Sequence, residues 1–148
     1  MELQKKPDET NPWSLALRLD YRLTEGDDGA DQVGFNWTTQ RKIGERLQFT
    51  GVVLGNVQHG SLRADGVGFE ARASLNYDVG NGLKLGVESF NIYGRTGNFG
   101  GFDDQNHQLG PVLTQKLTGG SSLLLGALFG ISDAAEDVDL RLWLTHSF

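Results

Sequence analysis

The histidines are the most versatile chemical groups in this sequence. His59 falls in a polar segment, His107 begins a strand-like segment, and His146 lies two residues before the last residue. A Ser–His–acid site needs its members within hydrogen-bonding reach of one another. The three histidines are predicted on different segments, and Ser147 points to the opposite face of the strand that carries His146. We therefore predict no catalytic residues and no enzymatic activity.

Acidic residues gather between the apolar segments, where carboxylate oxygens could bind a divalent cation. They are Glu25, Asp27, Asp28, Asp31, Asp103, Asp104, Asp133, Glu136 and Asp137. The stretch DDGAD lacks the full spacing of an EF-hand loop, and the chain has no cysteine for a thiolate site. We interpret these residues as parts of solvated loops, and we predict neither a metal site nor a cofactor.

A further set of charged residues lies within the strand-like segments, on the face opposite the apolar residues. Its members are Arg18, Asp20, Arg22, Glu70, Arg72, Asp78, Lys84, Glu88, Lys116, Asp139 and Arg141. The same face carries many glycines, and such a mixture of large and small residues suits the narrow lumen of an eight-stranded barrel. Charges in a low-dielectric wall are costly unless they are paired. We therefore predict a charge network that fills the lumen; unpaired charges around water would instead line a narrow polar path.

The segments that position these charges alternate apolar and polar residues with a period of two, which is typical of strands with two different faces. Eight such segments are predicted, at residues 13–23, 33–43, 47–57, 67–79, 83–93, 107–117, 123–131 and 139–148. Short turns alternate strictly with longer polar loops. This pattern predicts an all-β, antiparallel, up-and-down barrel at residues 13–148, preceded by a flexible segment at residues 1–12.

The alternation also predicts strand register. The expected cross-strand pairs are Val79–Leu83, Tyr77–Leu85, Asp78–Lys84 and Phe69–Tyr93, and closure of the first strand on the last would place Asp20 near Arg141 and Arg22 near Asp139. Pro111 interrupts the sixth segment and predicts a bulge, because proline lacks a backbone N–H.

Aromatic residues on the apolar face are predicted near the two ends of the strands. They are Trp13, Tyr21, Phe35, Phe49, Phe69, Tyr77, Tyr93, Phe129 and Phe148. Amphipathic rings gather in this way at the two interfaces of a membrane. We expect Phe99 and Phe102, in the loop at residues 95–106, to pack over the mouth of the barrel.

The last ten residues, DLRLWLTHSF, alternate and end on an aromatic residue. They resemble the C-terminal assembly signal of bacterial outer-membrane β-barrels, although His146 stands where that signal more often has an aromatic residue. The resemblance implies a small, monomeric, eight-stranded barrel in the outer membrane of a Gram-negative-type bacterium, with short periplasmic turns and long external loops. Its partners would be the lipid bilayer or detergent, and the barrel-assembly machinery through the last strand.

Length and charge leave several functions open. The 148 residues suit one domain, and a net charge of −6 argues against nucleic acid as a partner. No apolar run is long enough for a transmembrane helix. The segment MELQKKPDETNP has no apolar core, so we expect a mature or recombinant chain without a signal peptide. We predict a structural role as a scaffold. The alternatives are a narrow passive channel, a soluble lipocalin-like barrel that binds an apolar ligand, and the C-terminal part of a larger or engineered barrel.

Overall fold

The computed structural model of the chain describes residues 2–5, 12–24, 29–60 and 62–147, and Phe148, Glu25, Asp27 and Asp28 therefore lie outside the described residues. The strands are β1 (Glu2–Lys5), β2 (Trp13–Arg22), β3 (Asp31–Ile43), β4 (Leu47–His59), β5 (Val67–Gly80), β6 (Leu83–Arg95), β7 (Asn106–Lys116), β8 (Ser121–Gly130) and β9 (Val138–His146). Two short 3-10 turns, η1 (Phe102–Asp104) and η2 (Thr118–Gly120), precede β7 and β8.

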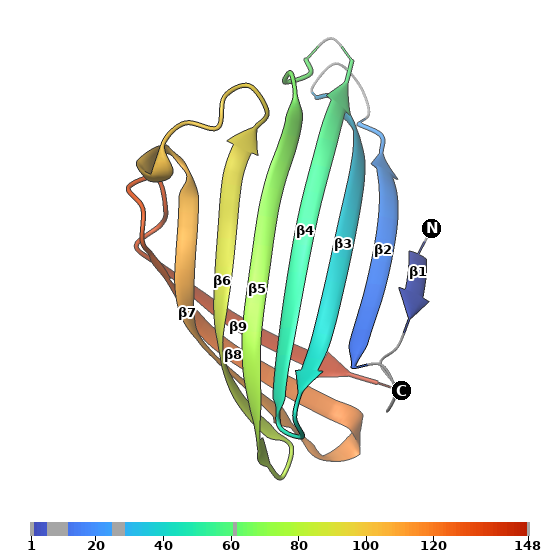
Figure 1. Cartoon of the computed structure of the whole chain (residues 1–148), viewed down its shortest axis with the longest axis vertical. Helices are drawn as coiled ribbons and strands as arrows, with labels where there is room; N and C mark the ends of the chain where they lie inside the picture. Colours follow the sequence, from blue (N-terminus) through green and yellow to red (C-terminus); the bar gives the residue numbers. More distant parts are fainter. Residues whose placement is uncertain (1, 6–11, 25–28, 61, 148) are drawn as a thin grey trace.

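All the described strands form one antiparallel sheet in the order of the sequence (Figure 1). The eight predicted strands correspond to β2–β9, so the prediction of an up-and-down all-β fold is confirmed. The sequence does not predict β1, which pairs with β2 from Glu2 opposite Arg18 to Lys5 opposite Leu15. Among the described residues, no helix has the length and apolar character needed to cross a membrane.

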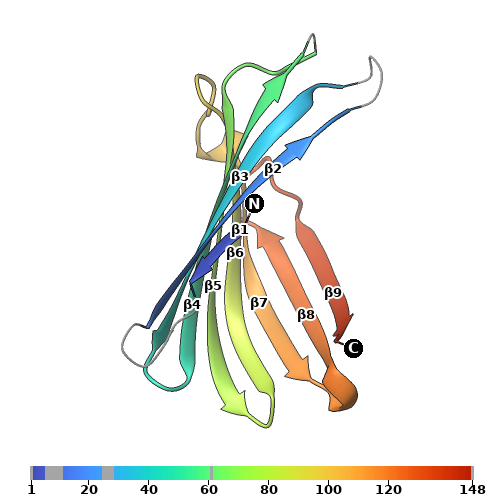
Figure 2. The same cartoon turned by 90° about the vertical axis from the view of Figure 1, so that its right-hand side faces the viewer.

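The sheet curls strongly, so that β8 and β9 pass behind the middle strands in Figure 1 and splay away from β1–β3 in the side view of Figure 2. Its two edge strands, β1 and β9, are not paired with each other, so the described sheet is not closed into a barrel. The expected contacts of Asp20 with Arg141 and of Arg22 with Asp139 are therefore wrong for this structure. Part of the edge of β2 is occupied by β1, and the carboxylate of Asp20 instead lies 3.7 Å from the guanidinium of Arg18.

The curl gives the sheet two faces that can be told apart by a contact between distant strands. Arg141 of β9 forms an ion pair with Glu88 of β6, although β7 and β8 lie between these strands in the sheet. Such a contact is possible only across the inside of the curl. We call this side the concave face; it carries the even-numbered residues of β2–β4, of β5 as far as Asp78 and of β6 from Lys84 to Ile92. The opposite side, with the odd-numbered residues of β2–β5, is the convex face.

The turns explain most of the register. Asn81 and Gly82 both have positive φ, at 53° and 77°, as a two-residue hairpin needs in order to match the twist of its strands. Tyr77 faces Leu85 and Asp78 faces Lys84, as predicted.

The other two expected pairs of this hairpin are wrong, because irregularities at both ends of the ladder shift the register. Gly80 faces Leu83 in place of Val79, and Phe69 faces Gly94 in place of Tyr93. A shift near the turn and another near the loop leave Val79 and Tyr93 outside the paired positions.

Pro111 interrupts β7 without changing the register. Pairing between β7 and β8 stops after Leu109–Phe129 and resumes at Val112–Gly126 in the same register. The predicted bulge is therefore wrong: the ladder has a local gap instead. This gap is enough to accommodate proline, which has no backbone N–H.

Little of the apolar surface is buried. Among the described residues, the only buried hydrophobic side chains are Val112 and Leu128, with 4% and 2% of their surface exposed. Leucines on the convex side of β9 are far more exposed to solvent: Leu140 is 77% exposed, Leu142 70% and Leu144 66%. A large continuous apolar surface of this kind marks contact with a partner or a membrane.

Candidate functional site

The concave face holds a cluster of charges around one aromatic ring. The guanidinium of Arg141 lies 4.6 Å from the centre of the Phe90 ring, and that of Arg72 lies 5.0 Å from it. Each arginine also has a carboxylate partner: Glu88 pairs with Arg141, and Glu70 lies 2.9 Å from Arg72. Strands β5, β6 and β9 thus contribute to one structure, which we call the concave cluster.

The two ion pairs of this cluster differ in burial. The side chains of Arg141 and Glu88 are 20% and 15% exposed, whereas those of Arg72 and Glu70 are 44% and 30% exposed. Desolvated pairs depend much more strongly on both partners than solvated ones. The sequence predicts all four charges on one face but gives Phe90 no role. Alternation places Phe90 on this face between Glu88 and Ile92, but nothing in the sequence around it marks it as a partner of the two arginines.

A polar cavity of about 340 Å³ lies further along the concave face, over β2–β5. Its polar lining residues are Arg18, Asp20, Arg22, Gln32, Asn36, Asn56 and Glu70. Four predicted luminal charges therefore share this cavity. Arg95 reaches the same region, because it donates hydrogen bonds to Asn56 Oδ1 at 3.1 Å and to the carbonyl of Gly66 at 2.6 Å. The sequence does not predict a role for Arg95, because this residue lies at the junction of a strand and a loop.

The remaining predicted luminal charges lie elsewhere along the strands. Asp78 is opposite Lys84 beside the turn, and its carboxylate accepts a hydrogen bond from the Gly80 N–H at 2.9 Å. Lys116 is opposite Ser122, and Asp139 is opposite Leu128.

Aromatic side chains on the convex side form chains of contacts near the long loops. The rings of Phe35 and Phe69 are 6.4 Å apart, and Phe69 is 6.3 Å from Phe99. Tyr93 lies 5.6 Å from His107, which stacks on Phe102 at 4.5 Å. Phe99 and Phe102 thus pack on the convex side, and the prediction that they cover the barrel mouth is wrong.

The other predicted interface aromatics are spread along the sheet. Tyr21 donates a hydrogen bond to Asp31 Oδ2 at 3.2 Å, and the guanidinium of Arg41 lies 5.0 Å from the Trp13 ring. Phe49 lies on the strand β4, where its ring would be 3.3 Å from a side chain built at Gly51. Tyr77 and Phe129 are both exposed.

His107 joins this convex surface to two long loops. Its Nδ1 lies 2.9 Å from Asn91 Oδ1 and its Nε2 lies 3.0 Å from Gln105 Oε1, while its backbone N–H donates to Ser132 Oγ at 2.9 Å. Asn91 in turn donates to Ser89 Oγ at 2.9 Å. The polar side chains of Ser89 and Asn91 on the convex side of β6 thus have hydrogen-bond partners within the protein.

The histidines do not converge. His59 ends β4 and His107 lies in β7. His146 lies 2.9 Å from the hydroxyl of Ser121, beside the turn between β7 and β8. Within the part of the chain that the structure describes, no three His, Cys, Asp or Glu residues are grouped so that they could hold a metal ion.

A curled antiparallel up-and-down sheet with an apolar convex face and charges on its concave face is typical of proteins of the membrane β-barrel type. Residues 5–140 match the family described as "Putative MetA-pathway of phenol degradation", and the chain belongs to this family. It is a family of bacterial outer-membrane proteins. Neither the curated proteins nor the solved structures contain a match.

Proposed function

We propose that this chain is a monomeric, integral outer-membrane β-barrel whose role is structural. In this proposal the convex face contacts lipid, the charges of the concave face fill the lumen, and the long loops face outward as an acidic surface. Family membership supports the outer-membrane location. The barrel is inserted by the assembly machinery and performs no enzymatic reaction.

The observation that carries the proposal is the contact between β6 and β9. Arg141, Glu88 and Phe90 meet across the concave face, with two strands between them in the sheet. A lumen of eight strands is wide enough for side chains and little else. Two paired arginines that share an aromatic ring suit such a space, because each arginine has a carboxylate partner and a cation–π contact with Phe90.

Single-cysteine spin labelling tests this arrangement, and the natural chain contains no cysteine that would interfere. Leu142→Cys places a label on the convex face, and Asn36→Cys places one in the polar cavity of the concave face. After refolding into phospholipid vesicles, the Leu142 label should be relaxed by oxygen, which concentrates in lipid. The Asn36 label should be shielded from it. Equal relaxation of both labels by a water-soluble nickel complex would overturn the proposal.

A second candidate function is a narrow passage for small polar solutes or ions. The polar cavity supports it, because Arg18 and Asp20 in that cavity are about half exposed. Planar-bilayer recording tests this function. A steady conductance that changes with Asp20→Asn would favour the passage, whereas a silent bilayer containing heat-modifiable protein would favour the filled lumen.

A further inference from the structure

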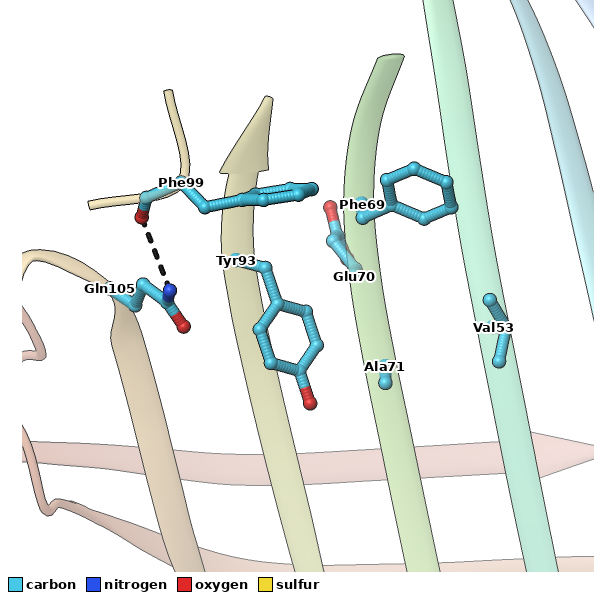
Figure 3. A pocket seen from close by; sticks show the side chains of 7 residues that line it. All are labelled: Val53, Phe69, Glu70, Ala71, Tyr93, Phe99 and Gln105. Carbon is cyan, nitrogen blue, oxygen red and sulfur yellow. Dashed lines mark hydrogen bonds between the residues drawn. The ribbon is translucent and has the colours of Figure 1, made fainter. Parts of the chain in front are cut away.

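The convex side carries an apolar hollow of about 410 Å³ near the long loops, lined by residues of β4, β5 and β6 and of the loop before β7 (Figure 3). Its lining residues are Val53, Phe69, Glu70, Ala71, Tyr93, Phe99 and Gln105. Sites for small ligands span roughly 300–1,000 Å³ and are mostly apolar with few polar groups. This hollow has both properties.

The hollow exists because the loop folds outward and small residues lie beneath it. Phe99 packs against Phe69 on the loop side of the hollow, while Ala71 and Val53 lie further along the strands toward the short turns (Figure 3). On the neighbouring strands, Phe69 has Gly55 and Gly94 as its pairing partners. Because Ala71 contributes only a methyl group, the hollow is shallowly filled between the rings of Phe69, Tyr93 and Phe99.

The loop that supplies Phe99 is fixed by hydrogen bonds. Gln105 donates from Nε2 to the carbonyl of Phe99 at 3.1 Å, and its Oε1 lies 3.0 Å from His107. The hydroxyl of Ser132, from the neighbouring loop, donates to the carbonyl of Gln105 at 2.6 Å. The ring of Phe99 is therefore held in place by a network that reaches β7 and the loop after β8.

The same bonds define what the hollow can bind. Both polar ends of the Gln105 amide already have protein partners, so the rim of the hollow directs little hydrogen-bonding capacity toward a ligand. The Glu70 carboxylate is engaged by Arg72 on the concave face. Apart from the hydroxyl of Tyr93, what remains is an aromatic and aliphatic surface (Figure 3), which favours a largely apolar ligand segment.

We infer that this hollow binds an acyl chain of an outer-leaflet lipid, which enters sideways from the bilayer. The inference rests on the proposed function, because the hollow opens on the convex face that is proposed to contact lipid. It is continuous there with an exposed apolar surface that includes Leu75, Tyr77 and Val87. An acyl chain stays bound for a longer time in a fixed hollow than on the smooth surface around it.

Native mass spectrometry of the detergent-folded protein tests the inference, with dipalmitoyl phosphatidylethanolamine added to the micelles as the probe. Ala71→Trp fills the hollow, and Ala73→Trp adds the same side chain on the same face of β5 outside the lining. We expect one retained lipid in the natural protein and in Ala73→Trp, and a roughly tenfold loss of retention in Ala71→Trp, which corresponds to about 1.4 kcal/mol.

A second pair of variants keeps the test decisive if a tryptophan variant does not fold. Phe99→Ala removes a wall of the hollow, whereas Phe102→Ala alters the same loop outside the lining. Loss of lipid only in Phe99→Ala supports the site. Equal retention in all detergent-folded variants, or no retained lipid in the natural protein, refutes it. A chain that folds in buffer without detergent would refute the proposed function itself, and the two failures are therefore distinguishable.

Discussion

The ion pair between Glu88 and Arg141 gives the sharpest prediction about stability. Glu88→Gln removes the carboxylate but preserves the shape of the side chain, and it leaves the guanidinium of Arg141 only 20% exposed without its ionic partner. Removing one partner of a buried pair costs about 3–5 kcal/mol. Because this pair is not completely buried, and because Phe90 still contacts Arg141, we expect about 3 kcal/mol, at the lower end of that range.

The matched control is Glu70→Gln, which makes the same chemical change in the second pair of the concave cluster. Its partner Arg72 is 44% exposed, so water can replace the lost carboxylate. Solvated pairs contribute less than about 1 kcal/mol. The free energy of unfolding is to be measured by urea titration in lipid vesicles, with tryptophan fluorescence and heat-modifiable gel mobility as independent signals.

A double-mutant cycle completes the test. We expect the combined Glu88→Gln and Arg141→Gln variant to be more stable than the sum of the single effects predicts, with a coupling of roughly 1–3 kcal/mol. If Glu88→Gln and Glu70→Gln lower stability equally, or if the coupling is below about 0.5 kcal/mol, the argument that these residues meet in a water-poor interior is refuted.

Three further predictions concern the convex side and its loops. Gly55→Ala should destabilise the fold by about 1–3 kcal/mol, because the Cβ of the new alanine would lie 2.2 Å from the Phe35 ring. Gly126→Ala is the control: its Cβ would lie 3.5 Å from the nearest atom, and it should have little effect in the same urea titration. His107→Ala should speed amide hydrogen exchange in the loop before β7, because Gln105 loses its imidazole partner while the backbone bond to Ser132 is kept; unchanged exchange in that loop would contradict the role of His107 as its anchor. Leu142→Arg, on the exposed convex face, should cost about 2–4 kcal/mol in lipid vesicles if it lies at the bilayer midplane; no cost would contradict lipid contact there.

The strands could be predicted from the sequence because a period of two is a local signal. Most of the strands β2–β9 carry their own alternation, although β8 (SSLLLGALFG) is apolar on both faces. The tight turn at Asn81–Gly82 sets the start of a hairpin without help from distant residues. Register is less local. The displaced positions of Val79 and Tyr93 arise from irregularities at the two ends of the β5–β6 ladder, which alternation alone does not encode.

The contacts of the candidate site could be predicted only in part. Alternation places Glu88 and Arg141 on the same face, but which acid meets which arginine depends on how far the sheet curls, and the sequence pairs Arg141 with the wrong partner, Asp20. The outward fold of the loop with Phe99 depends on hydrogen bonds from Gln105 and Ser132, residues with no distinctive pattern of their own.

The central claim is that the apolar convex face contacts lipid, and refolding from denaturant with and without detergent micelles tests it most directly. Each sample is compared by circular dichroism and by the gel mobility of unheated and boiled protein. The account predicts a β-rich, heat-modifiable species that forms only when detergent is present, because the leucines of β9 are 66–77% exposed and need an apolar environment. A cooperative β-fold in plain buffer would contradict the claim and would turn the apolar face into the interior of a soluble barrel.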